Sequence, residues 1–165
     1  MEDVSGIADT RHVIGRGQES VVFLSRGGAS VIKLNRFTLV DSEYTPFHFF
    51  EGIKAYNELR PDTRLDIIGF PENEAGDVCA VMRQPYVRAR RNATQKEIDA
   101  FLETNGDFAT GRDGMGGRIV HKSPKYTIHD AEPRNVLVGI DGGLFFIDLI
   151  VQKNHGEPQF AGAGE

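Results

Sequence analysis

Residues 126–151 read YTIHDAEPRNVLVGIDGGLFFIDLIV, and they combine two short apolar runs with several polar side chains. The runs at residues 136–138 and 144–147 are typical of buried β-strands. Between them lies the sequence DGG, residues 141–143, and glycine reaches the positive φ angles that a tight turn needs. The stretch therefore predicts a β-hairpin.

This hairpin would gather three polar side chains, because Asp130 and Asn135 precede it and Asp148 follows it. Two carboxylates held close together repel each other, and burying them without a partner is costly. A divalent cation removes that cost, and the oxygen ligands of Asn135 and Asp148 suit Mg²⁺. Asp130 is then free to accept a proton from an incoming hydroxyl group.

The order of these residues resembles the catalytic centre of a protein kinase, in which a catalytic Asp, an Asn five residues later and a metal-binding Asp follow one another. More narrowly, HDAEPRNVLV followed by DGGLFFIDL is similar to the small Ser/Thr/Tyr-kinase-like domains in polyvalent proteins of phages and conjugative elements. The resemblance implies an α+β, protein-kinase-like fold. It would have an antiparallel β-sheet N-lobe with a helix of the αC type, and a truncated C-lobe with few helices.

We expect one kinase-like domain over residues 1–165. Its parts would be an N-lobe at about 12–84, a hinge at 84–88, a reduced C-lobe at 89–151 and a flexible tail at 152–165.

The composition is that of a soluble globular domain, with 39% hydrophobic and 26% charged residues. No apolar run resembles a membrane span or a signal peptide, which predicts a cytoplasmic protein without a membrane partner. The net charge of -5 argues against nonspecific nucleic-acid binding. Cys79, the single cysteine, lies in an apolar run and is predicted to pack in the core.

A second group of candidate site residues lies near the N-terminus, where IGRGQESVVF resembles a kinase glycine-rich loop. Gly15 and Gly17 occupy its first two glycine positions, Ser20 replaces the third, and Val22 follows at the apolar position. Glycines let the backbone approach phosphates closely. An ordinary hairpin turn is the alternative interpretation of this segment alone.

Residues 31–33 (VIK) resemble the kinase strand that carries the phosphate-binding lysine, so Lys33 would hold the α- and β-phosphates. The alternative is a lysine on an edge strand that reaches into water. Thr45 and Pro46 predict the start of the following helix. There the resemblance implies a glutamate that orients the lysine. Glu51 fits this position best, with Glu58 and Asn57 as alternatives.

Residues 65–70 and 78–82 predict two paired strands that lead to the expected hinge. By the resemblance, Gln84 would be the gatekeeper residue, while the Pro85 carbonyl and the Val87 N–H would bind adenine. A strand that runs into an ordinary loop is the other interpretation.

The capping box at residues 94–97 (TQKE) predicts a helix that ends at Gly106. Glycines at residues 107–117 predict an irregular loop, and residues 118–120 and 126–128 predict another short hairpin.

Taken together, these residues and their resemblance to kinases imply a kinase with ATP and Mg²⁺ as cofactors, Asp130 as the base, and Lys33 and Glu51 as further catalytic residues. Its phosphate acceptor would be a protein Ser, Thr or Tyr hydroxyl group. One alternative is a pseudokinase that acts as a nucleotide-binding or protein-interaction module, because Leu149 follows the metal-binding Asp148 where kinases have Phe-Gly. Another is a small-molecule kinase of the aminoglycoside phosphotransferase type. The acceptor, the oligomeric state and the length of the natural polypeptide are left open by the residues.

Overall fold

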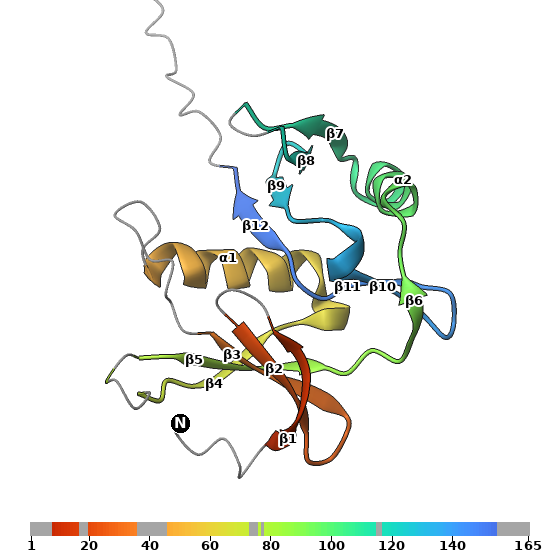
Figure 1. Ribbon diagram of the computed structural model, residues 1–165. Coiled ribbons are helices and arrows are strands. Elements are labelled where there is room, and N and C mark those ends of the chain that lie inside the picture. The colour runs from red at the N-terminus through yellow and green to blue at the C-terminus, as the bar shows by residue number, and fades with distance from the viewer. Residues whose placement is uncertain are drawn as a thin grey trace, which may run out of the picture.

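The computed structural model describes residues 8–16, 20–35, 46–72, 76, 78–114 and 117–154 (Figure 1). Within these residues the chain forms two α-helices and three antiparallel sheets, which agrees with the predicted α+β class. In the same part of the chain, no helix is both long enough and apolar enough to cross a membrane.

The largest sheet has five strands in the order β1-β2-β3-β5-β4. One of its apolar clusters is built from alternate residues of neighbouring strands, including Val21, Phe23, Ile32 and Val81. Because β3 lies between β2 and β5, Lys33 is on an interior strand. The strands are β1 (Ala8–Arg16), β2 (Ser20–Ser25), β3 (Ser30–Asn35), β4 (Asp66–Gly69) and β5 (Ala80–Pro85).

Helix α1 (Pro46–Leu59) lies between this sheet and strand β12 (Ile150–Lys153) (Figure 1). Its first residue is Pro46, whose fixed φ and missing N–H suit that position. Phe49 packs against the sheet with Ala80 and Met82. After the helix ends, Pro61 begins a short 3₁₀ turn, η2 (Pro61–Thr63).

The predicted hairpin is formed by β10 (Val136–Gly139) and β11 (Leu144–Phe146), with Val136 opposite Phe146. Gly142 has a φ of 87° in the turn, as the DGG sequence requires. A third strand, β6 (Ala89–Asn92), pairs with β10. The sequence did not predict β6, because all four of its residues are exposed and it has no apolar periodicity.

Helix α2 (Gln95–Gly106) begins with the predicted capping box, in which the Thr94 side chain accepts from the Glu97 N–H. Asp107, with a left-handed φ of 53°, caps its C-terminus.

The remaining sheet has the order β12-β9-β8-β7 and packs beside α2 (Figure 1). Its other strands are β7 (Ala109–Arg112), β8 (Ile119–Lys122) and β9 (Tyr126–His129). Two predictions are corrected here. Strand β7 lies inside the predicted irregular loop, and β12 extends two residues into the segment assigned to the tail. Residues 155–165 lie outside the described part of the chain.

The main core joins α1, α2 and the two smaller sheets through side chains such as Tyr56, Ile98, Ile128 and Phe146. Each of these four has at most 1% of its surface exposed. Cys79 is 2% exposed, in agreement with its predicted packing role.

Candidate active site

Hydrogen bonds bring the backbone segments of Asp130, Asn135 and Asp148 together. The Asn135 side chain donates from Nδ2 to the Asp130 carbonyl oxygen at 2.8 Å. The Ile147 N–H donates to the Asn135 carbonyl at 2.9 Å, which places Asp148 next to the same loop. The second bond follows from the β10–β11 hairpin, because residues 135 and 147 flank its paired ends.

The pairing of β9 with β12 brings the same two segments together a second time. His129, directly before Asp130, lies opposite Ile150, two residues after Asp148. Both segments therefore leave the paired strands at the same end, since antiparallel partners are in register there.

Asp130 has a backbone φ of 58°, which is uncommon for a residue other than glycine. Its carbonyl also accepts a hydrogen bond from the Glu132 N–H at 2.8 Å, so the loop is fixed by local contacts. Backbone conformations of this kind cluster at functional sites. Asp130 lines a hollow of about 220 Å³, whose other lining residues are Asp113, Arg118, Ile119, His129, Ile150 and Gln152.

Lys33 connects the five-stranded sheet with the Asp148 segment. It is 6% exposed, and its Nζ donates to the Ile147 carbonyl at 2.6 Å. The same Nζ lies 3.8 Å from Asp148 Oδ1. Burial lowers the pKa of the Lys33 ammonium, while the neighbouring Asp148 carboxylate acts in the opposite direction. The interpretation of Lys33 as a water-facing lysine on an edge strand is therefore wrong.

Gly15, Val22 and Lys33 lie in one row across β1, β2 and β3. Val22 is the cross-strand partner of both Gly15 and Lys33. Because direct cross-strand partners share one face of a sheet, this row faces the same way as the lysine. Ser20 is the first residue of β2 and is partly buried. Gly17 lies outside the described residues.

Glu51 lies on the exposed side of α1, two residues after the buried Phe49. Residues two apart on a helix do not share a face, so Glu51 points away from the core that Phe49 enters. Within the described residues, the structure does not form the predicted pair of Glu51 with Lys33.

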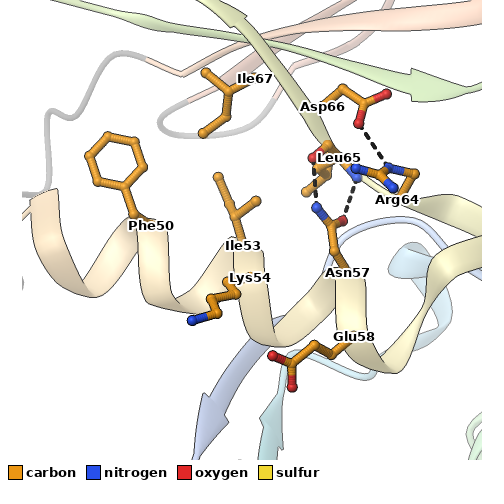
Figure 2. A pocket seen from close by; sticks show the side chains of 9 residues that line it. All are labelled: Phe50, Ile53, Lys54, Asn57, Glu58, Arg64, Leu65, Asp66 and Ile67. Carbon is orange, nitrogen blue, oxygen red and sulfur yellow. Dashed lines mark hydrogen bonds and ion pairs between the residues drawn. The ribbon is translucent and has the colours of Figure 1, made fainter.

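The two alternatives to Glu51 have other partners. Asn57 donates to the Leu65 carbonyl at 2.8 Å and accepts from the Leu65 N–H at 2.7 Å. Glu58 accepts from the Tyr126 hydroxyl at 2.8 Å and from Lys153 at 3.0 Å. Figure 2 shows Asn57 turned toward Leu65 and Glu58 turned away from it.

A larger hollow, of about 600 Å³, lies between α1 and the start of β4 (Figure 2). It is lined by Phe50, Ile53 and Leu65 together with the two alternatives Asn57 and Glu58, among others. Lys33, Asp130, Asn135 and Asp148 are not among its lining residues, so this hollow is separate from the predicted site.

Tyr56, on α1, lies in the site region, and the sequence analysis did not assign it to the site. Its hydroxyl lies 2.6 Å from the Phe146 carbonyl oxygen and 2.8 Å from Thr63 Oγ1. Gln84, the predicted gatekeeper, is 1% exposed and donates to the Tyr56 hydroxyl at 2.9 Å. Burial raises the pKa of the Tyr56 phenol, which therefore stays protonated. Helical spacing revealed that Tyr56 is buried but not what its hydroxyl contacts.

The predicted hinge residues follow Gln84 directly. Gln84 lies opposite Val31, two positions from Lys33, so both side chains are on the same face of the sheet. Pro85 ends β5 and is exposed, and Val87 is partly buried in the segment between β5 and β6. The Tyr86 N–H between them donates to the Ala29 carbonyl at 3.0 Å.

The donor atoms of Asn135 and Asp148 fit Mg²⁺. Because Asn135 uses Nδ2 to bond the Asp130 carbonyl, its amide oxygen is left for another partner. The Asp148 side chain is 64% exposed and therefore open to a ligand. Mg²⁺ is commonly bound through one or two carboxylates, with water and substrate phosphates completing its shell. Over the described ranges, no group of three or more His, Cys, Asp or Glu side chains offers a metal site made of protein ligands only.

Comparison with known proteins gives a family match. The family described as Serine/Threonine/Tyrosine Kinase found in polyvalent proteins matches residues 2–155. No curated protein and no solved structure matches the chain.

Proposed function

Because the chain belongs to the family of serine/threonine/tyrosine kinases found in polyvalent proteins, we propose that it transfers the γ-phosphoryl group of ATP to a hydroxyl group. One observation supports this most directly. Lys33 Nζ lies 2.6 Å from the Ile147 carbonyl and 3.8 Å from Asp148 Oδ1, although 114 residues separate Lys33 from Ile147. The amine to which we assign phosphate binding and the carboxylate to which we assign metal binding are thus neighbours, as phosphoryl transfer needs.

In this proposal, each group acts by position and charge. Lys33 would hold the α- and β-phosphates, and its burial would strengthen that attraction. Mg²⁺, held by Asn135 and Asp148, would neutralise the charge on the phosphates. Asp130 would orient the acceptor hydroxyl group and take its proton.

The nucleotide would lie under the row that contains Gly15 and Val22, with Gly17 and Ser20 in the glycine-rich loop. Adenine would be bound by the Pro85 carbonyl and the Val87 N–H, the two hinge residues after Gln84. Backbone N–H groups at such loops can bind phosphate without a contribution from a side chain.

The hollow beside Asp130 supports a protein hydroxyl group as the acceptor. Its volume is about 220 Å³. Sites that enclose a whole small molecule usually measure about 300–1,000 Å³. A hollow of this size suits one Ser, Thr or Tyr side chain, with the rest of the acceptor protein outside. We therefore prefer a protein acceptor to an aminoglycoside-like molecule.

A second candidate function is favoured by the position of Glu51. Without the pair between a helix glutamate and Lys33, the protein could bind Mg·ATP and regulate a partner without efficient transfer. This pseudokinase proposal differs from the first in one measurable quantity, the rate of phosphoryl transfer.

The test uses ATP labelled at the γ-phosphorus and a peptide library that contains Ser, Thr and Tyr. We expect Mg²⁺-dependent labelling of peptide or of the protein itself. Asp130→Asn should stop labelling but keep Mg·ATP binding, whereas Asp148→Ala should lose both. Asp141→Asn, in the exposed turn of the same hairpin, is the matched control and should remain active. Binding without any labelling would support the pseudokinase, and absence of Mg·ATP binding would refute both proposals.

A further inference from the structure

Two buried hydroxyl groups meet at one carbonyl oxygen, that of Phe146. The Tyr56 hydroxyl lies 2.6 Å from this oxygen, and Thr63 Oγ1 lies 2.7 Å from it. A carbonyl oxygen has two lone pairs and can accept both bonds. Tyr56 is 1% exposed and Thr63 0% exposed, so water does not compete for these contacts.

Gln84 extends this group into the five-stranded sheet. Its Nε2 lies 2.9 Å from the Tyr56 hydroxyl and 2.6 Å from the Thr63 carbonyl. The contacts therefore join α1, η2, β5 and the end of β11. Buried polar groups are costly unless they are paired, and here each named group has a partner.

The two residues after this carbonyl are Ile147 and Asp148, and Ile147 is also held. Its N–H donates to the Asn135 carbonyl at 2.9 Å, and its carbonyl accepts from Lys33 at 2.6 Å. The backbone that leads to Asp148 is therefore fixed by three successive polar groups. The Asp148 side chain itself is 64% exposed, so its position depends on this backbone more than on packing.

We propose that Tyr56 and Thr63, supported by Gln84, are positioning residues that hold Asp148 for Mg²⁺ binding. This inference rests on the proposed function of Asp148. Helix α1 then contributes to the site through the neutral Tyr56 hydroxyl, and not through a glutamate bonded to Lys33. Groups behind metal ligands commonly change metal affinity or activity about 10- to 100-fold when they are removed.

The test compares Tyr56→Phe, Thr63→Val and their combination with Tyr126→Phe. Tyr126 is the matched control, because its side chain is also buried and its hydroxyl donates at 2.8 Å to Glu58, which is not part of the proposed site. The first measurement is amide hydrogen exchange at Ile147 in the protein without nucleotide. We expect the combined variant to exchange at least about tenfold faster at Ile147, beyond any change in global stability, and Tyr126→Phe to match the wild type.

The second measurement is the Mg²⁺ concentration that gives half-maximal phosphoryl transfer at fixed ATP. We expect it to rise about tenfold or more in the combined variant, with a smaller rise in Tyr56→Phe. An unchanged exchange rate at Ile147, or a Mg²⁺ requirement equal to that of Tyr126→Phe, would overturn the inference. A wild-type protein without transfer would overturn the proposed function only, because the exchange measurement needs no nucleotide.

Discussion

Replacing Lys33 with methionine tests the centre of the proposed site, because it removes the amine and keeps a side chain of similar length. In the protein without nucleotide, two effects oppose each other. The Ile147 carbonyl loses its donor, which destabilises the protein by about 1–3 kcal/mol. The variant also no longer buries a charge, which stabilises it. Asp148 is 64% exposed, so losing its ion pair costs at most about 1 kcal/mol. We therefore expect a modest change in the melting temperature of the free protein.

The effect on nucleotide binding should be larger. For the wild type, Mg·ATP at about 100 times its Kd adds about 2.7 kcal/mol of stability, or about 5 to 11 °C for a chain of 165 residues. Losing one charged contact of about 1.5–3 kcal/mol weakens binding about 12- to 140-fold. At the same Mg·ATP concentration, the nucleotide would stabilise Lys33→Met by only about 0.3–1.3 kcal/mol, which raises its melting temperature by about 1 to 5 °C.

The assay is thermal unfolding of both proteins with and without Mg·ATP. Lys54→Met is the matched control, because Lys54 is exposed on α1 and lies outside the proposed site. It should keep the full ligand-dependent shift. If Lys33→Met also kept the full shift, Lys33 would not contact the nucleotide, and the reasoning from its position would be refuted.

Three further predictions concern stability. The Arg60 guanidinium lies 4.6 Å from the Phe146 ring centroid, so Arg60→Met should lower the free energy of unfolding in urea by about 2 kcal/mol. An unchanged free energy of unfolding would contradict this. The pKa of Glu97 is lowered to about 2, chiefly by Arg91, so its contribution to stability is present above pH 4.5 and is lost as the pH falls toward 2. Unfolding measured across this range should depend less on pH in Glu97→Gln, and equal slopes would disprove the assignment. Gly142→Ala should lower the free energy of unfolding by about 1–2 kcal/mol, because alanine is strained at a φ of 87°, and an unaffected melting temperature would argue against that strain.

The sequence predicted those elements whose signals are local. The β10–β11 hairpin followed from apolar runs on both sides of Gly142, and the start of α2 followed from its capping box. Strands β6 and β7 were missed because their residues are exposed and show no apolar alternation, so nothing in their pattern distinguishes them from a loop. Strand β6 pairs with β10, far along the chain, whereas β7 pairs with the next strand, β8.

The candidate site likewise contains features that a local sequence signal predicts and features that no local signal predicts. The order of Asp130, Asn135 and Asp148 indicated that their segments would meet, and the hairpin brings them together. Glu51 was chosen by its distance from Lys33 along the chain, but the direction of a helical side chain depends on how the whole helix packs. Tyr56 has the spacing of an ordinary core aromatic residue, and its contact with a carbonyl 90 residues away leaves no local signal.

The contact of α1 with the Phe146 carbonyl is made by uncharged groups, and this determines how the site responds to ionic strength. Dissolved ions screen exposed charges beyond about 8 Å at physiological ionic strength and more strongly in concentrated salt. The attraction of Lys33 for the exposed Asp148 carboxylate should weaken in concentrated salt only, because the two groups lie 3.8 Å apart and Lys33 is buried. Hydroxyl groups buried against a carbonyl carry no net charge to screen. The position of the Phe146 backbone before Asp148 should therefore be the same in concentrated salt as in dilute buffer.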